Sequence, residues 1–135
     1  MRILISLIFL LCSLSIFSQE IGSAMNGNHS IKLLKKDSLF CFVYSNANSK
    51  KVNDEKSFHF PNLDTMYLIV KKGFEHQRDH QVILQTNIDT IVKFDFKNLN
   101  GKNMLMIRQN NLSDENSSIS TFFTQDEIEK LFGNP

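Results

Sequence analysis

Apolar and polar residues alternate most clearly in residues 90–99 of this 135-residue chain. One set of alternate positions holds Thr90, Val92, Phe94 and Phe96, and the other holds Ile91, Lys93, Asp95 and Lys97. Because successive side chains of a strand point to opposite faces of a sheet, this pattern predicts a strand with one buried and one solvated face. Asn100 and Gly101 follow, and both tolerate positive φ, so they predict a two-residue type I′ turn.

The predicted turn sets the pairing of the strand that follows it. Counted back from the turn, Leu99 faces Lys102, Phe96 faces Leu105 and Phe94 faces Ile107. On the other face Asp95 lies between Lys93 and Arg108, which is a favourable arrangement of charge. A slip of one residue would turn the apolar side of the second strand to water. The pattern therefore predicts a hairpin in this register.

Shorter apolar segments bounded by turn residues predict the remaining strands. They cover residues 31–34, 39–44, 57–60, 66–70, 81–86 and 119–123. Residues 39–44 and 66–70 are apolar on both faces, as expected of strands that are covered on each side. Residues 19–29 are small and polar without periodicity and predict a flexible lead-in, and residues 45–55 predict a polar loop.

A capping box predicts one short helix near the C-terminus. Thr124 and Glu127 have the required spacing of three, and Phe123 and Ile128 are placed as a hydrophobic staple. Gly133 suits the end of the helix. Together the patterns predict a mainly β fold in a single domain over residues 30–135. We expect an antiparallel β-sandwich or curved sheet of about seven strands, with the helix covering an end or a face.

The N-terminal residues have the layout of a secretory signal peptide. Arg2 is followed by fifteen uncharged, mostly apolar residues and then by the small residue Ser18. Fifteen residues are too few for a membrane-spanning helix, which needs about 20. We therefore predict a signal peptide over residues 1–18, with residues 22–24 as an alternative small-residue cleavage site, and no membrane span after cleavage. A lipoprotein is not favoured, since Leu11 precedes Cys12 where lipid attachment needs a small residue.

This leader predicts an exported chain, either periplasmic or secreted. Cleavage removes one basic and no acidic residue, which leaves 14 of each. That balance argues against nucleic acid as a partner, because phosphate binding relies on a marked basic excess. Cys41 is the one cysteine left, so no disulfide can form within the chain. Its apolar segment predicts a buried, unreactive thiol.

One cluster has the spacing of metal ligands and contains Glu75, His76, Asp79 and His80. If this segment formed a helical turn, His76 and His80 would share one face and could bind zinc, with Asp79 or the distant His59 as a third ligand. The metalloprotease motif would also need a Glu directly after the first His, and Arg78 lies within the cluster. A solvated loop is the favoured interpretation. We assign no metal, cofactor or catalytic residue from the sequence.

A partial resemblance covers seventeen residues. The residues that carry it are Phe58, His59, Phe60, Pro61, Asn62, Leu63, Tyr67, Val70, Gly73 and Phe74. This segment resembles the signature strand pair of carboxypeptidase-regulatory-like, transthyretin-type β-sandwich domains. It departs from that signature by lacking the glycine before Tyr67 and by a gap one residue short. The resemblance implies a non-catalytic sandwich of the kind found in cell-envelope proteins.

The favoured functional hypothesis is a small exported bacterial envelope or secreted protein. It would act as a non-catalytic binding or accessory module for an unknown protein, small-molecule or glycan ligand. One alternative is a metal-dependent enzyme or zinc-binding protein that uses His76 and His80. Another is a structural or assembly subunit that adds an exposed strand to a partner.

Overall fold

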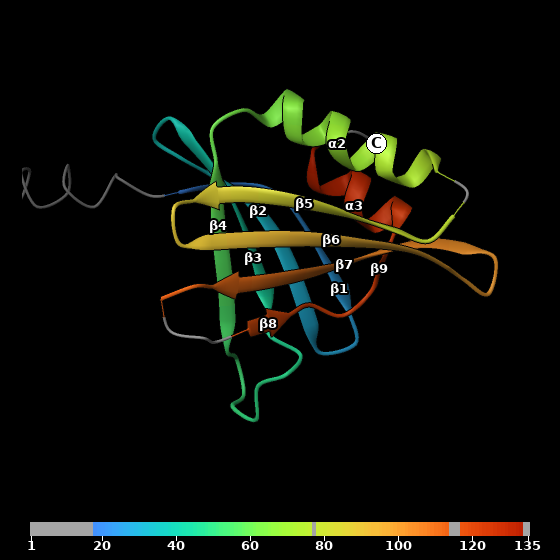
Figure 1. The fold of residues 1–135 in the computed structure, drawn as a ribbon. Coiled ribbons are helices and arrows are strands. Elements are labelled where there is room, and N and C mark those ends of the chain that lie inside the picture. The colour runs from blue at the N-terminus through green and yellow to red at the C-terminus, as the bar shows by residue number, and fades with distance from the viewer. Residues whose placement is uncertain (1–17, 77, 114–116, 134–135) are drawn as a thin grey trace, which may run out of the picture.

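Two antiparallel sheets form the body of the molecule (Figure 1). The structure is a computed structural model that describes residues 18–76, 78–113 and 117–133. The first sheet contains β1 (Gln19–Asn26), β2 (His29–Lys36), β3 (Leu39–Ser45) and β4 (Glu55–Phe60), in that order. The second sheet contains β5 (His80–Asn87), β6 (Thr90–Leu99), β7 (Lys102–Asn111) and β8 (Ser117–Ile119), and β9 (Phe123–Thr124) also pairs with β7. The predicted antiparallel β-sandwich is confirmed.

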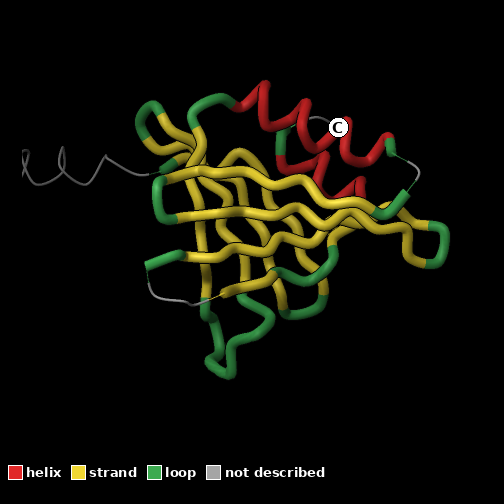
Figure 2. Tube along the Cα trace, viewed as in Figure 1, coloured by secondary structure: helices red, strands yellow, loops and turns green. Residues whose placement is uncertain are grey.

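Two helices close one side of this sandwich. Helix α2 (Leu63–Glu75) connects the sheets, and α3 (Gln125–Leu131) follows β9. The strands of one sheet run across those of the other, and both helices lie on the same side of the molecule (Figure 2). Neither of these described helices combines the length and apolar content needed to cross a bilayer.

The core lies between the facing sides of the two sheets. Alternate residues point inward, as the period of two requires. The first sheet contributes Ile31, Leu33, Phe42, Tyr44, Phe58 and Phe60, and the second contributes Val92, Phe94, Phe96, Leu105, Ile107 and Phe123. Burying one large apolar side chain stabilises the fold by about 1.5–3 kcal/mol relative to exposure. This shared interior is therefore the main source of stability.

The predicted hairpin and the predicted C-terminal cap are both confirmed. Strands β6 and β7 pair in the predicted register, and Asn100 and Gly101 have φ values of 54° and 82°. At α3 the Thr124 hydroxyl accepts from the Glu127 amide, and the Glu127 carboxylate accepts from the Thr124 amide. Gly133 has a φ of 78°, the left-handed conformation that suits a residue after a helix end.

The strand predicted at residues 66–70 is wrong, because these residues belong to α2. Asn62 caps this helix by accepting a hydrogen bond from the Thr65 amide at 3.0 Å. The buried residues of α2 are Met66, Val70, Gly73 and Phe74, which share one face at helical spacing. The segment of the family resemblance therefore contains one strand, β4, and a helix. In the signature it resembles, that segment holds two strands.

The predicted flexible lead-in is also wrong, because residues 19–26 form strand β1 along the edge of the first sheet. Helix α3 packs on this strand, and Gly22 lies against the backbone of Leu131. A Cβ atom at position 22 would lie 2.6 Å from the Leu131 carbonyl oxygen, so only glycine fits there. The strand predicted over residues 119–123 is divided into β8 and β9. With β1 added, the structure describes nine strands, against about seven expected.

A buried polar network joins the two sheets at Tyr44. Its hydroxyl donates to the side-chain oxygen (Oε1) of Gln109 at 2.9 Å and accepts from the Ser118 hydroxyl at 2.7 Å. The Gln109 amide nitrogen in turn donates to the backbone oxygen of Ser57, on β4. Burial raises the pKa of the Tyr44 hydroxyl to about 12, against an opposing effect of the Ser118 hydrogen bond.

We expect stability to fall as the pH rises from the ordinary tyrosine pKa of 10.0 toward 12. In that window Tyr44 loses its proton in the unfolded chain and keeps it in the folded one. The full loss in the free energy of unfolding therefore amounts to roughly 2–3 kcal/mol. Urea unfolding at about pH 9 and about pH 11 measures the change, and about half of the full loss is expected by pH 11. In Tyr67→Phe, Tyr44 is the one tyrosine, so the phenolate absorbance reports it alone. Ionisation of Tyr44 near pH 10 with the fold intact would contradict this prediction.

Candidate functional site

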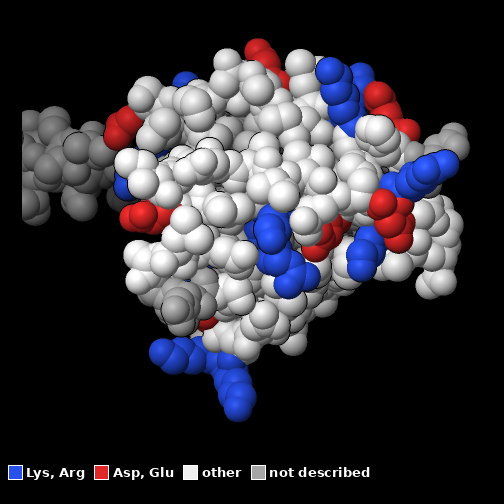
Figure 3. Space-filling model, viewed as in Figure 1, with Lys and Arg blue, Asp and Glu red and all other residues white. Residues whose placement is uncertain are grey.

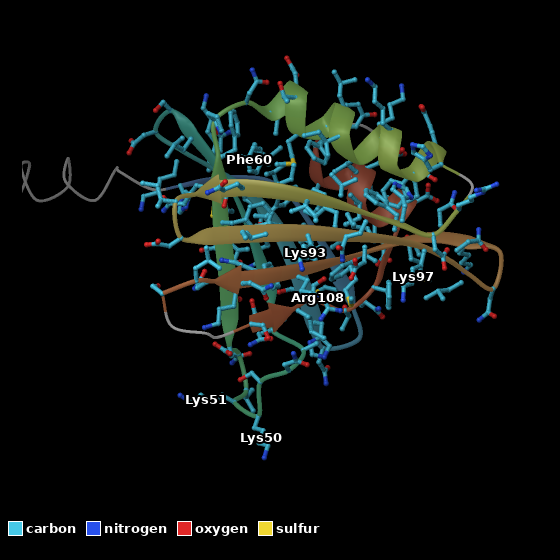
Figure 4. The ribbon with its side chains drawn as sticks, viewed as in Figure 1. Lys50, Lys51, Phe60, Lys93, Lys97 and Arg108 are labelled. Carbon is cyan, nitrogen blue, oxygen red and sulfur yellow. The ribbon has the colours of Figure 1, made fainter. Side chains whose placement is uncertain are left out.

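A hollow of about 500 Å³ opens between the β1–β2 turn and the loop from β3 to β4. We call it the loop groove. Its lining residues are Met25, Asn28, His29, Ser45, Asn46, Ser49, Lys51, Val52, Asn53 and Asp54. Lys50 and Lys51 mark this loop at the end of the molecule opposite α2 (Figure 4). The sequence predicted these residues only as parts of the polar loop 45–55 and of the flexible lead-in 19–29.

The side chain of Asn46 holds the loop in shape. Its amide nitrogen donates to the Asp54 carboxylate at 3.2 Å, and its carbonyl oxygen accepts from the backbone amides of Asn48 and Ile119. The backbone amide of Ala47 also donates to the Ile119 oxygen at 2.7 Å. Because Ile119 belongs to β8, these bonds tie the loop of the first sheet to the second sheet. The groove is therefore supported by both sheets.

The chemistry of the loop groove is polar with apolar edges. Hydrogen bonds from Ser49 and Asn46 lower the pKa of Asp54, so its carboxylate is charged at neutral pH. Lys51 supplies a cation on the same loop. Met25 and Val52 are 59% and 89% exposed and provide apolar surface at the rim. Most other lining residues carry amide or hydroxyl groups, which can both donate and accept hydrogen bonds.

The structure brings His76 and His80 together, by a route that differs from the predicted helical turn. Helix α2 ends at Glu75, and His76 has extended backbone angles of −70° and 132°. The chain then reverses direction into β5, which places the two imidazole centroids 4.6 Å apart. His80 also stacks on Phe96, with ring centroids 4.9 Å apart and planes 9° from parallel. The two rings therefore meet across the junction of α2 and β5.

The other residues named as zinc ligands do not join this pair. The Asp79 carboxylate accepts a hydrogen bond from the backbone amide of Asn98 at 3.0 Å. His59 lines a separate hollow with Thr86 and Asn87, at the opposite end of β5 from His80. Within residues 18–76, 78–113 and 117–133, no group of three or more His, Cys, Asp or Glu side chains is arranged to hold a metal ion.

Strand pairing places Cys41 opposite His59 on the first sheet, a neighbour that the local sequence did not indicate. Cys41 is 6% exposed, as predicted, and its thiol donates to the Phe42 oxygen at 3.6 Å. Burial raises the pKa of this thiol, against smaller opposing effects of Ser57 and Lys36. Burial therefore favours the neutral thiol over the thiolate, which is the reactive form.

The outer face of the second sheet carries Lys93, Lys97 and Arg108 (Figure 4). The Arg108 guanidinium lies 3.6 Å from the Asp95 carboxylate, the favourable contact expected from the hairpin register. Asp95 is only 8% exposed and also accepts from the Gln81 amide. Basic and acidic side chains are scattered among uncharged residues over the face seen in Figure 3. The face therefore has mixed charge.

Comparison with known proteins gives no match to a family model, to a curated protein or to a solved structure.

Proposed function

We propose that this protein is a small exported binding module whose loop groove takes a neutral, hydroxyl-rich ligand such as a glycan. The observation that carries the proposal is the lining of the groove by amide and hydroxyl side chains at an end of the sandwich. Ligand sites commonly combine a concave surface with a few convergent polar groups. Loops held by a rigid β scaffold are a frequent place for such sites.

The lining favours a sugar over a strongly charged ligand. Asp54 and Lys51 carry opposite charges, so neither an anion nor a cation gains a clear advantage in the groove. Asn28 and Asn53 are exposed and offer paired donors and acceptors that suit vicinal hydroxyl groups. Met25 and Val52 present apolar surface that can pack against the C–H face of a sugar ring.

Binding of a panel of neutral oligosaccharides, measured on a glycan array and by calorimetry, tests this proposal. Replacing His29 with alanine and Asn53 with glycine removes two side chains of the groove. Glycine suits position 53 because Asn53 has a φ of 65°. If each lost hydrogen bond contributes about 1 kcal/mol, the double variant should bind about thirtyfold more weakly.

His59→Ala is the matched control for this experiment, since His59 is an exposed imidazole of the same sheet outside the groove. We expect this control to bind like the unmodified protein. Failure of the unmodified protein to bind any member of the panel would overturn the proposal. Equal binding by the groove variant and the control would overturn it as well.

We also propose export with cleavage after Ser18. Support comes from strand β1, which begins at Gln19, so this cut would leave every described element whole. A cut after Ala24 would remove most of β1, including Gly22 and its contact with Leu131.

The mass of the protein recovered from the periplasm or medium of a bacterial host is therefore expected to match a chain that starts at Gln19. Edman sequencing of the same material identifies the first residue independently. A product that retains Met1, or one that starts at Met25, would contradict this prediction.

A further inference from the structure

Among the described residues, His80 combines a fixed ring with an unpartnered nitrogen atom. Its Nδ1 atom lies 2.9 Å from the backbone oxygen of Arg78. A carbonyl oxygen can only accept a hydrogen bond, so Nδ1 carries the proton in this contact. Stacking on Phe96 holds the plane of the ring. Tautomer and orientation are therefore both set by the fold.

The other ring nitrogen, Nε2, is buried and has no hydrogen-bond partner in the described structure. With the proton on Nδ1, the lone pair of the neutral imidazole lies on Nε2. An imidazole that donates from one nitrogen to a backbone carbonyl and presents the lone pair of the other has the arrangement of a metal ligand.

A second imidazole lies next to the ring of His80. The His76 ring is centred 4.6 Å from that of His80, and His76 is exposed, so its ring has room to turn. On its solvent side His76 borders a hollow shared with Lys72 and Glu75.

We propose that His76 and the Nε2 atom of His80 form a two-histidine site for a divalent transition metal ion of zinc type. Imidazole nitrogen suits Zn²⁺, Cu²⁺ and Ni²⁺ in preference to Mg²⁺ or Ca²⁺. Because the site has two protein ligands, water or an external ligand fills the remaining coordination positions. Nearby Lys72 and Arg78 oppose a cation, so the site is a weak and exchangeable one.

Calorimetric titration of the untagged full-length protein with Zn²⁺ near neutral pH tests this site, with His76→Gln as the test variant. His76 follows the end of α2 and is exposed, so this change leaves the core untouched. His59→Gln is the matched control. We expect one ion per chain in the unmodified protein and the control, and binding weaker by about tenfold or more in His76→Gln.

Nitrogen NMR of the histidine rings tests the role of His80 without replacing it. Addition of Zn²⁺ should shift the Nε2 resonance of His80 and leave the ring resonances of His59 in place. The proposal is overturned if the unmodified protein binds no Zn²⁺, if the two glutamine variants bind it equally well, or if the His80 ring does not respond. Glycan binding by the loop groove is a separate property, so its failure would leave these outcomes unchanged.

Discussion

Replacing Phe94 with alanine is expected to lower the free energy of unfolding by about 3–5 kcal/mol. Phe94 lies on the inner face of β6, is fully buried, and packs against Phe58 from the opposite sheet with ring centroids 6.2 Å apart. The change removes apolar contact with both sheets and leaves a cavity between them. Urea denaturation followed by circular dichroism measures the loss.

Ile83→Ala is the matched control for this prediction. Ile83 lies on β5, beside β6, but it points outward and is 62% exposed. Its replacement should change the free energy of unfolding by about 0.5 kcal/mol or less. A larger loss for Ile83→Ala than for Phe94→Ala would mean that the second sheet faces the other way, which would contradict the sandwich.

Replacing Gly73 with alanine is expected to destabilise the protein by roughly 1–3 kcal/mol, although alanine is the better helix former. Gly73 lies on the buried face of α2, and a Cβ atom there would overlap the ring of Phe96. That ring cannot swing aside, because Phe74 packs against it edge-on and His80 stacks on it. Helix α2 must therefore shift away from the second sheet.

Lys71→Ala separates this packing effect from helix propensity. Lys71 is an exposed position two residues earlier in the same helix. We expect its replacement to change the free energy of unfolding by about 0.5 kcal/mol or less. Thermal and urea unfolding of the two variants give the comparison. A Gly73→Ala protein as stable as the unmodified one would show that α2 does not pack closely on Phe96.

The parts of the fold that were predicted correctly are those that local chemistry determines. In the β6–β7 hairpin, alternation and the Asn100–Gly101 turn act together, so strand, turn and register all follow from adjacent residues. The Thr124 capping box depends on a spacing of three residues in the same way. Each signal lies within one element or two neighbouring ones, where distant contacts have little influence.

The two missed elements were missed for different reasons. Residues 66–70 are a run of five apolar residues, which looks the same in a buried strand as in part of a helix. The deciding feature was the longer helical spacing of Met66, Val70 and Phe74. Strand β1 has few apolar residues, and it is ordered by its pairing with β2 and its contact with α3.

The candidate sites were less accessible to sequence analysis than the fold. The loop groove depends on hydrogen bonds between Asn46 and Ile119, which are 73 positions apart. The spacing of His76 and His80 did identify the histidine pair. Of the two expected third ligands, Asp79 accepts a hydrogen bond from Asn98, and His59 lies at the other end of β5. Which polar side chains share a concave surface is decided by how the two sheets meet.

We propose that ligand binding occurs at the loop groove. Backbone amide NMR of the uniformly labelled protein, with and without a glycan that binds it on the array, tests this most directly. We predict shifts concentrated in residues 25–29 and 45–54, with little change in the hairpin turn at Asn100 and Gly101. Shifts confined to the outer face of the second sheet or to the edges of β4 and β5, with the groove unaffected, would contradict the claim.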